Sequence, residues 1–358
     1  MSHEVDTMAY VIEGGDPWHL AYTKDRSVGV PQSEATPQRM REAAKMLWEP
    51  RKVQLSYNWN NEWRPAVQSK DEDTPGRTRN SAYAMIRSDT GDYLASVGKR
   101  YTEFFNESLF TLAEELAGLG ARLDTCGSLC RGTRVFALLS AGESFEARKG
   151  DVLKPYLLLH NTHDGMHRLR GRYTTIRVVC ANTESIALSG SALEWTQPHT
   201  SSIRRESLAV DAAEVLGLAI RATEESKQVA QTLAQTSSTQ RDAGLFFAQL
   251  LTDTDSPEEA QARVAEITEK GGRAETILAN KGDELMRLRH YGQGNNGTTV
   301  WDDFNAVTEF IDYQRARAGN WKKQRSSLSL DGLNAAQFGS GNAMKERALK
   351  LALTRVAA

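Results

Sequence analysis

Hydrophobic and polar residues alternate along much of residues 76–200, the pattern of strands that bury one side of a sheet. The predicted strands cover 82–87, 93–97, 121–124, 134–140, 156–161 and 168–180. The first two flank the sequence SDTGD, whose composition indicates a hairpin turn. An apolar stripe at helical spacing predicts one helix over about 103–117, with Thr102 as its N-cap. This order predicts a mostly antiparallel sheet with one helix packed on a face.

From residue 201 the apolar period becomes that of helices. The predicted helices cover 203–234, 239–251, a stretch beginning at Ser256-Pro257, 299–318 and 342–353. On the 299–318 helix, Asn305, Thr308 and Asp312 form a polar stripe that we expect to face water or to contact the sheet domain. The predicted fold class is therefore α+β: a mostly antiparallel sheet with a packed helix, followed by a helical C-terminal region.

The first 75 residues hold four of the seven tryptophans, Trp18, Trp48, Trp59 and Trp63, interspersed with six prolines. One helix is predicted from Pro37 to Trp48, because Thr36 is a good N-cap and proline suits the first helical position. We expect this segment to be irregular and to wrap the following domain, with its aromatic side chains as anchors. The predicted units are thus 1–75, 76–200 and 201–358.

The charge is unevenly spread along the 358 residues, although the formal net charge is only −2. Residues 122–180 contain ten Arg or Lys against five Asp or Glu, whereas 204–290 contain eleven against fifteen, and 313–350 eight against two. The near-neutral total argues against a general polyanion binder, while the asymmetry permits local basic patches.

Three cysteines, Cys126, Cys130 and Cys180, make no disulfide framework, which favours a reducing cytoplasm. The N-terminal sequence lacks the basic and apolar regions of a signal peptide, and no apolar run approaches the roughly 18 residues of a membrane span. We therefore expect a cytoplasmic protein that has no membrane contact.

A row of arginines is the strongest candidate for a working surface. Arg168, Arg170 and Arg172 are spaced by two within a predicted strand, so they are expected to project from one side of the sheet. Further cations, with an aromatic beside the last three, come from neighbouring elements and the C-terminal tail: Arg131, Arg134, Arg177, Lys322, Lys323 and Arg325. Basic surfaces with interleaved aromatics hold single-stranded nucleic acid. The alternative is a solvated strand face, or an edge strand protected by charge.

A histidine cluster at 160–167 offers a second candidate. His160, His163, Asp164 and His167 are metal-ligand types at close spacing, as a metal-dependent enzyme such as a nuclease would need. However, residues 160 and 163 would face opposite sides of a strand, and Asp164-Gly165 is explained as a turn. We therefore assign no metal site and no catalytic residue. The GxGxxG sequence at 292–297 follows a helix-like segment, so it is predicted to be a loop rather than a nucleotide site.

Several motifs taken in order resemble a family of phage- and plasmid-borne proteins known as a domain of unknown function. They are Asp16–His19, Arg87–Gly91, Val97-Gly98 with Tyr101, Gly127–Leu139, His163–Gly165, Arg177–Thr183, and Trp301 with Asn305–Glu309. The resemblance covers nearly all of the chain. The sequence departs from the family pattern at Leu20-Ala21 and at Ala181. The resemblance implies a mobile element, where replication and recombination factors are frequent, but no catalytic residue.

The leading hypothesis is a non-catalytic protein that binds single-stranded DNA during recombination or replication, by annealing or protecting strands, and that needs no cofactor. It could act as a homo-oligomer. A metal-dependent nuclease that uses the histidine cluster is one alternative. A host-interaction factor that binds protein through the acidic helical region is the other.

Overall fold

A nine-stranded sheet forms the centre of the protein. The structure, a computed structural model, describes residues 5–12, 26–65, 83–177, 182–184, 194–200, 208–314 and 340–356. The strands run in the order β13-β12-β11-β9-β8-β1-β2, with β10 paired to β11 and β14 to β12. They are β1 Val5–Ile12, β2 Ser27–Pro31, β8 Arg122–Leu129, β9 Arg134–Ser140, β10 Phe145–Arg148, β11 Asp151–Thr162, β12 Leu169–Arg177, β13 Asn182–Glu184 and β14 Glu194–Gln197. All their pairings are antiparallel except β1 with β2, which confirms the predicted sheet type.

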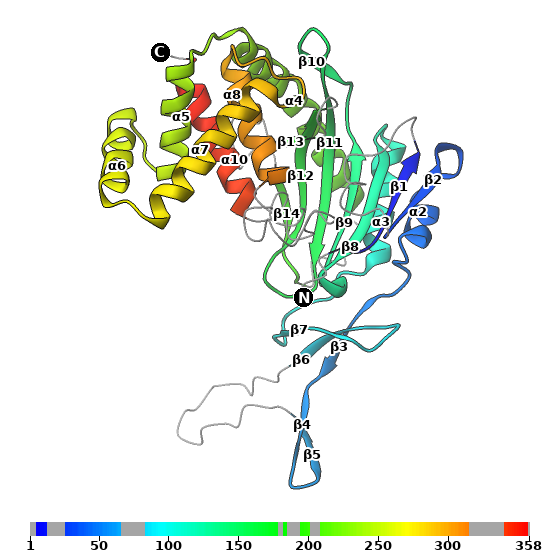
Figure 1. Ribbon diagram of the computed structural model, residues 1–358. Coiled ribbons are helices and arrows are strands. Elements are labelled where there is room, and N and C mark those ends of the chain that lie inside the picture. The colour runs from blue at the N-terminus through cyan, green and yellow to red at the C-terminus, as the bar shows by residue number, and fades with distance from the viewer. Residues whose placement is uncertain are drawn as a thin grey trace, which may run out of the picture.

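Helices α2 (Pro37–Ala43), α3 (Asn106–Gly118) and α4 (Leu208–Gln235) cover one face of this sheet (Figure 1). The predicted stripe of α3 is buried there, against alternate residues of β9 and β11 such as Ala137, Leu139 and Leu157. The helix begins later than predicted, at Asn106, and Thr102 does not cap it. The Glu49 carboxylate accepts the backbone N–H groups of Asn106 and Glu107 instead.

The opposite face of the sheet carries a smaller buried apolar cluster. It consists of Met8, Leu129, Phe136, Leu138, Tyr156, Leu158 and Ile176. Because side chains alternate along strands, these residues lie between the residues that face the helices. The sheet is therefore apolar at its centre on both faces.

An arm of further strands extends from one end of the sheet (Figure 1). Strands β3 (Pro50–Gln54), β6 (Tyr83–Arg87) and β7 (Tyr93–Val97) form a small antiparallel sheet, and β6–β7 is the predicted hairpin. At the far end lies the hairpin of β4 (Ser56–Trp59) and β5 (Glu62–Pro65). We call residues 50–65 and 83–100 the arm, and residues 56–65 its tip.

The arm differs from the expectation that tryptophans anchor the N-terminal segment. Trp48 is buried, whereas Trp59 and Trp63 are exposed at the tip, and Trp18 lies outside the described residues. The difference arises because residues 50–65 pair into strands that leave the body of the protein, so their side chains cannot reach it. The boundaries of the three predicted units stay a prediction.

The C-terminal region is helical, as predicted. Helices α5 (Gln240–Thr252), α6 (Pro257–Lys270), α7 (Arg273–Tyr291), α8 (Val300–Glu309) and α10 (Ser340–Thr354) follow α4. Helices α5, α7, α8 and α10 share a core that includes Phe246, Leu285, Trp301 and Phe304, and α6 packs against α5. The GxGxxG sequence links α7 to α8, which confirms a loop. Helix α8 ends in a π-helical turn, 310–314, rather than continuing as predicted. None of the helices among the described residues is long and apolar enough to cross a membrane.

Candidate nucleic-acid interface

Three arginines and a histidine share one face of the sheet. Arg170 pairs with His160 and Arg172 with Leu158 across β11–β12, and Arg134 pairs with Thr162 across β9–β11. Because directly paired residues of antiparallel strands point to the same side, these side chains lie beside the smaller apolar cluster. We call Arg134, His160, Arg170 and Arg172 the arginine face.

His160 shows how close the cations are. Its pKa is lowered to about 3, mainly by burial and in addition by the neighbouring Arg134, His167 and Arg170. The imidazole is therefore neutral at neutral pH. The guanidinium groups of Arg134 and Arg170 lie near a ring that adds no charge of its own.

Arg172 is already engaged with a helix. Its guanidinium donates to the Glu346 carboxylate on α10 at 2.6 Å, and its side chain is 25% exposed. The row predicted from the sequence is thus partly covered rather than fully solvated. Arg177 ends β12 opposite Leu153 and Asn182, and its side chain lies outside what the structure describes.

The remaining predicted cations divide into two groups. Arg131 is exposed in the β8–β9 connection, and Arg168 is exposed in the β11–β12 connection. The two connections lie side by side, since the His163 N–H donates to the Thr133 carbonyl at 2.8 Å. The Asp6 carboxylate fixes the first connection by accepting the N–H groups of Arg131 and Gly132. Lys322, Lys323 and Arg325, with Trp321, lie outside the described residues. The structure therefore gathers Arg131, Arg134, Arg168 and Arg170 at one end of the sheet.

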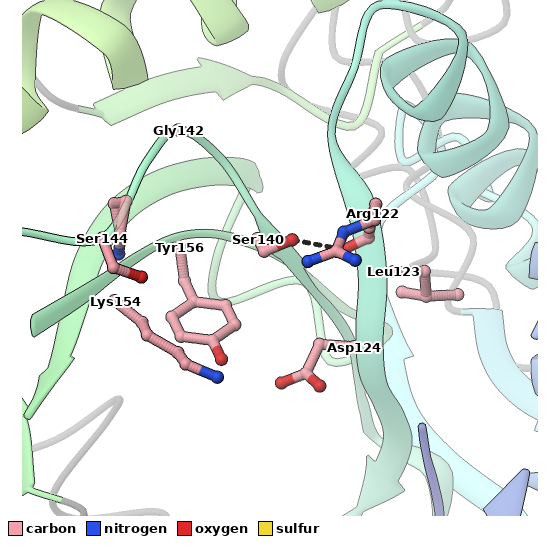
Figure 2. A pocket seen from close by; sticks show the side chains of 9 residues that line it. Arg122, Leu123, Asp124, Ser140, Gly142, Ser144, Lys154 and Tyr156 are labelled. Atoms are coloured by element: carbon pink, nitrogen blue, oxygen red, sulfur yellow. Dashed lines mark hydrogen bonds between the residues drawn. The ribbon is translucent and has the colours of Figure 1, made fainter. Parts of the chain in front are cut away.

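A pocket of about 70 Å³ opens toward the other end of the same face (Figure 2). Arg122, Asp124, Lys154 and Tyr156 line it, and the Ser140 hydroxyl donates to the Arg122 carbonyl at 3.4 Å. Small-molecule sites usually enclose about 300–1,000 Å³. This pocket suits water or a small ion, so it extends the polar surface without forming a nucleotide site.

A buried polar cluster joins the arm to the sheet. The His163 Nε2 and Asn106 Oδ1 atoms lie 3.1 Å apart, and the Asn106 amide donates to the Trp48 carbonyl at 2.8 Å. Glu49 binds the start of α3 and also pairs with Arg41. Burial lowers the pKa of His163 to about 3, so its neutral ring donates from Nε2 to Asn106. We call Trp48, Glu49, Asn106 and His163 the joint.

The histidines do not converge on a metal. His160 lies on the arginine face and His163 lies in the joint, as strand alternation predicts. Within the described residues, no group of three or more His, Cys, Asp or Glu side chains could hold a metal ion. The metal-dependent alternative therefore has no ligand set in this part of the chain.

The exposed aromatic side chains of the tip were not predicted from the sequence. Tyr57, Trp59 and Trp63 are 51%, 59% and 75% exposed. The available signal was Asn60-Asn61 between two short aromatic runs, because paired asparagines favour a two-residue hairpin turn. The surrounding prolines had suggested an irregular segment instead.

Comparison with known proteins gives a family. The model of a domain of unknown function, DUF932, matches residues 93–331. That range is narrower than the expected resemblance, because the motifs at Asp16–His19 and Arg87–Gly91 precede it. No curated protein and no solved structure matches the chain. The matched range covers two thirds of the sequence, including the strands of the arginine face, and the chain therefore belongs to the DUF932 family.

Proposed function

We propose that this protein binds single-stranded DNA, without catalysis, along the arginine face and the adjoining connections. The observation that carries the proposal is the gathering of four arginines at one end of the sheet, two from strands β9 and β12 and two from connections: Arg134, Arg170, Arg131 and Arg168. Guanidinium groups bind phosphate oxygens well, and cations in fixed positions along strands can follow a backbone of regularly spaced charges.

The surroundings support a nucleic acid more than a lone anion. The small pocket extends the polar surface of this face toward Lys154. The near-neutral total charge restricts such binding to this surface. We further propose that the protein acts in the cytoplasm of a bacterium that carries a phage or plasmid. There it anneals or protects strands during recombination or replication, as a homo-oligomer.

A salt series of binding measurements tests the proposal. Fluorescence anisotropy with labelled oligo(dT) from about 50 to 200 mM salt should show an affinity that falls steeply, because binding releases counterions. Arg168→Ala and Arg170→Ala should each weaken binding and reduce the slope by about 0.7 per lost phosphate contact. Arg263→Ala is the matched control, since Arg263 is exposed on α6 in the helical region. Unchanged affinity and slope in both test variants would overturn the proposal.

Glu346 provides a test in the opposite direction. The Glu346 carboxylate competes with phosphate for Arg172. Glu346→Gln removes that competitor, so oligo(dT) should bind more tightly and with a steeper salt slope. The gain should vanish when Arg172→Ala is added, because the released guanidinium is then absent. A gain that persists in the double variant would place the effect elsewhere.

A further inference from the structure

The tip of the arm is a well-defined hairpin that buries nothing. Asn60 and Asn61 have φ values of 51° and 63°, the left-handed backbone at both positions that a type I′ turn requires. The register pairs Tyr57 with Arg64, Asn58 with Trp63 and Trp59 with Glu62. All ten residues from Ser56 to Pro65 are nevertheless exposed. An isolated two-stranded hairpin is only marginally stable in water, so this one is suited to acting on something outside the fold.

The aromatic rings lie on both faces of the hairpin. Tyr57 and Trp59 are two residues apart on β4 and share a face with Arg64, whereas Trp63 lies on the other face beside Asn58. The tip contains no Leu, Ile, Val or Met. Protein interfaces also use Tyr, Trp and Arg, but they surround them with a contiguous apolar core that a tip without these aliphatic side chains does not provide. Separate rings among amide and hydroxyl groups provide stacking platforms instead, and every nucleobase has a face that can stack on them.

The charge of the arm favours the same partner. Its described residues include six cations, Arg51, Lys52, Arg64, Arg87, Lys99 and Arg100, and three acids, Glu62, Asp89 and Asp92. Two of the acids are paired within the arm, Glu62 with Arg64 at 2.9 Å and Asp89 with Arg87 at 2.8 Å. The arm therefore has a net positive charge, and Lys99 and Arg100 are exposed where the arm returns to the sheet.

The arm also continues directly from the proposed binding surface. The Tyr101 hydroxyl donates to the Thr162 carbonyl at 3.1 Å, so the base of the arm adjoins the end of β11. Gly132, next to Arg131, packs under Trp48 and Arg87. The arm therefore begins beside the connections that carry Arg131 and Arg168.

From this arrangement we infer that the tip is a base-stacking element: Tyr57, Trp59 and Trp63 stack on bases of the single strand whose phosphates lie along the arginine face. The inference rests on the proposed function and assigns it a second, chemically different contact. Phosphate contacts make affinity depend on salt, whereas stacking adds affinity that is nearly independent of salt.

The test compares tip variants with wild type by oligo(dT) anisotropy and tryptophan fluorescence. Trp59→Ala with Trp63→Ala should weaken binding at least about tenfold while the salt slope stays unchanged, because stacked bases contribute without counterion release. Oligo(dT) should quench wild-type fluorescence, and the double variant should lose most of that quenching. Phe at both positions should restore most of the affinity. Tyr291→Ala is the control, since Tyr291 is 80% exposed at the end of α7.

The outcomes separate the two ideas. If the wild-type protein fails to bind oligo(dT) at any salt concentration, both the proposed function and the tip inference are overturned. Binding that depends on Arg168 and Arg170 but is unchanged in the Ala double variant leaves the proposed function intact and overturns the tip inference. A double variant that changes from oligomer to monomer in light scattering, with DNA affinity unchanged, would show that the tip binds a second copy of the chain, and would overturn the inference too.

Discussion

His160 and His163 are both buried, yet the strand directs them to different surroundings. His160 lies among cations on the arginine face, and His163 bonds to Asn106 in the joint. The alternation of side chains predicts their separation from the sequence alone. Their burial could not be predicted, because it depends on α3, Trp48 and other elements far away in the chain.

The two histidines should make stability fall as the pH falls. In the native protein each has a pKa of about 3, so it stays neutral, whereas the unfolded chain takes up protons near pH 6.5. Lowering the pH from 7 to 5 should therefore reduce the free energy of unfolding by about 2 kcal/mol per histidine.

Urea unfolding at the two pH values checks this prediction with His163→Gln. Glutamine can still donate to Asn106 but cannot take up a proton, so the variant should lose about 2 kcal/mol less than wild type over the same interval. Equal losses in the two proteins would show that His163 does not remain neutral in the native state.

The arginine row shows a second limit of prediction from the sequence at the scale of single residues. The spacing of two correctly placed Arg170 and Arg172 on one face. Arg168 differs because β12 begins at Leu169, which leaves Arg168 in the connection. The pairing of Arg172 with Glu346 joins residues 174 positions apart, and local sequence carries no signal for such a contact.

At the scale of elements, α8 illustrates which features are local. Thr299 forms a capping box with Asp302, and this start is predictable because the two residues of the box are only three positions apart. The expectation that the polar stripe faces water is wrong, because Asn305 and Thr308 are fully buried, whereas α8 does contact β13 of the sheet. Asp312 is also buried and pairs with Lys345 on α10 at 2.5 Å. Lys345 belongs to another helix, so the spacing along α8 could not indicate this pair.

Asp303 should be the most sensitive position of the helical region. Its carboxylate is fully buried and accepts from Arg289 at 2.5 Å, Arg355 at 2.8 Å and Ser238 at 2.5 Å. Asp303→Ala leaves Arg289 buried without its charge partner, which should lower the free energy of unfolding by about 3–5 kcal/mol. Chemical denaturation of the variant and the wild-type protein measures this loss in the free energy of unfolding.

The matched control for this variant is Arg263→Ala on α6. Arg263 pairs with Glu266, but both side chains are about half exposed, at 53% and 41%. Exposed pairs contribute little, so the change should stay within about 1 kcal/mol. Comparable losses in the two variants would show that burial of the Asp303 network is not what makes it stabilising.

At the scale of the whole molecule, the protein divides into a layered body and an arm (Figure 1). The sequence predicted most of the body, meaning the central sheet and the helices, because the period of apolar residues indicates amphipathic strands and helices. It did not predict the course of the arm or five strands that complete the sheet: β1, β2, β10, β13 and β14. The place of β1 depends on pairing with a distant segment, β8, whereas β10 pairs with the adjacent β11 and is too short to show a clear period.

The tip should be dispensable for folding. All of its residues are exposed, so replacing Ser56–Pro65 with a short Gly-Ser link removes no buried contact. The free energy of unfolding should change by no more than about 0.5 kcal/mol, as for surface changes in general. Thermal unfolding followed by circular dichroism checks this, and a large loss of stability would show that the tip supports the body after all.

The buried ion pairs of the helical region have a practical consequence. Arg289 with Asp303 and Lys345 with Asp312 are almost completely shielded from water, so dissolved ions screen them weakly. Molar salt, which shortens the screening length to about 3 Å, should therefore release nucleic acid from exposed cations while leaving the helices packed. A high-salt wash during purification should yield folded protein free of host nucleic acid, recognisable by a low ratio of absorbance in the nucleobase band to that in the aromatic band.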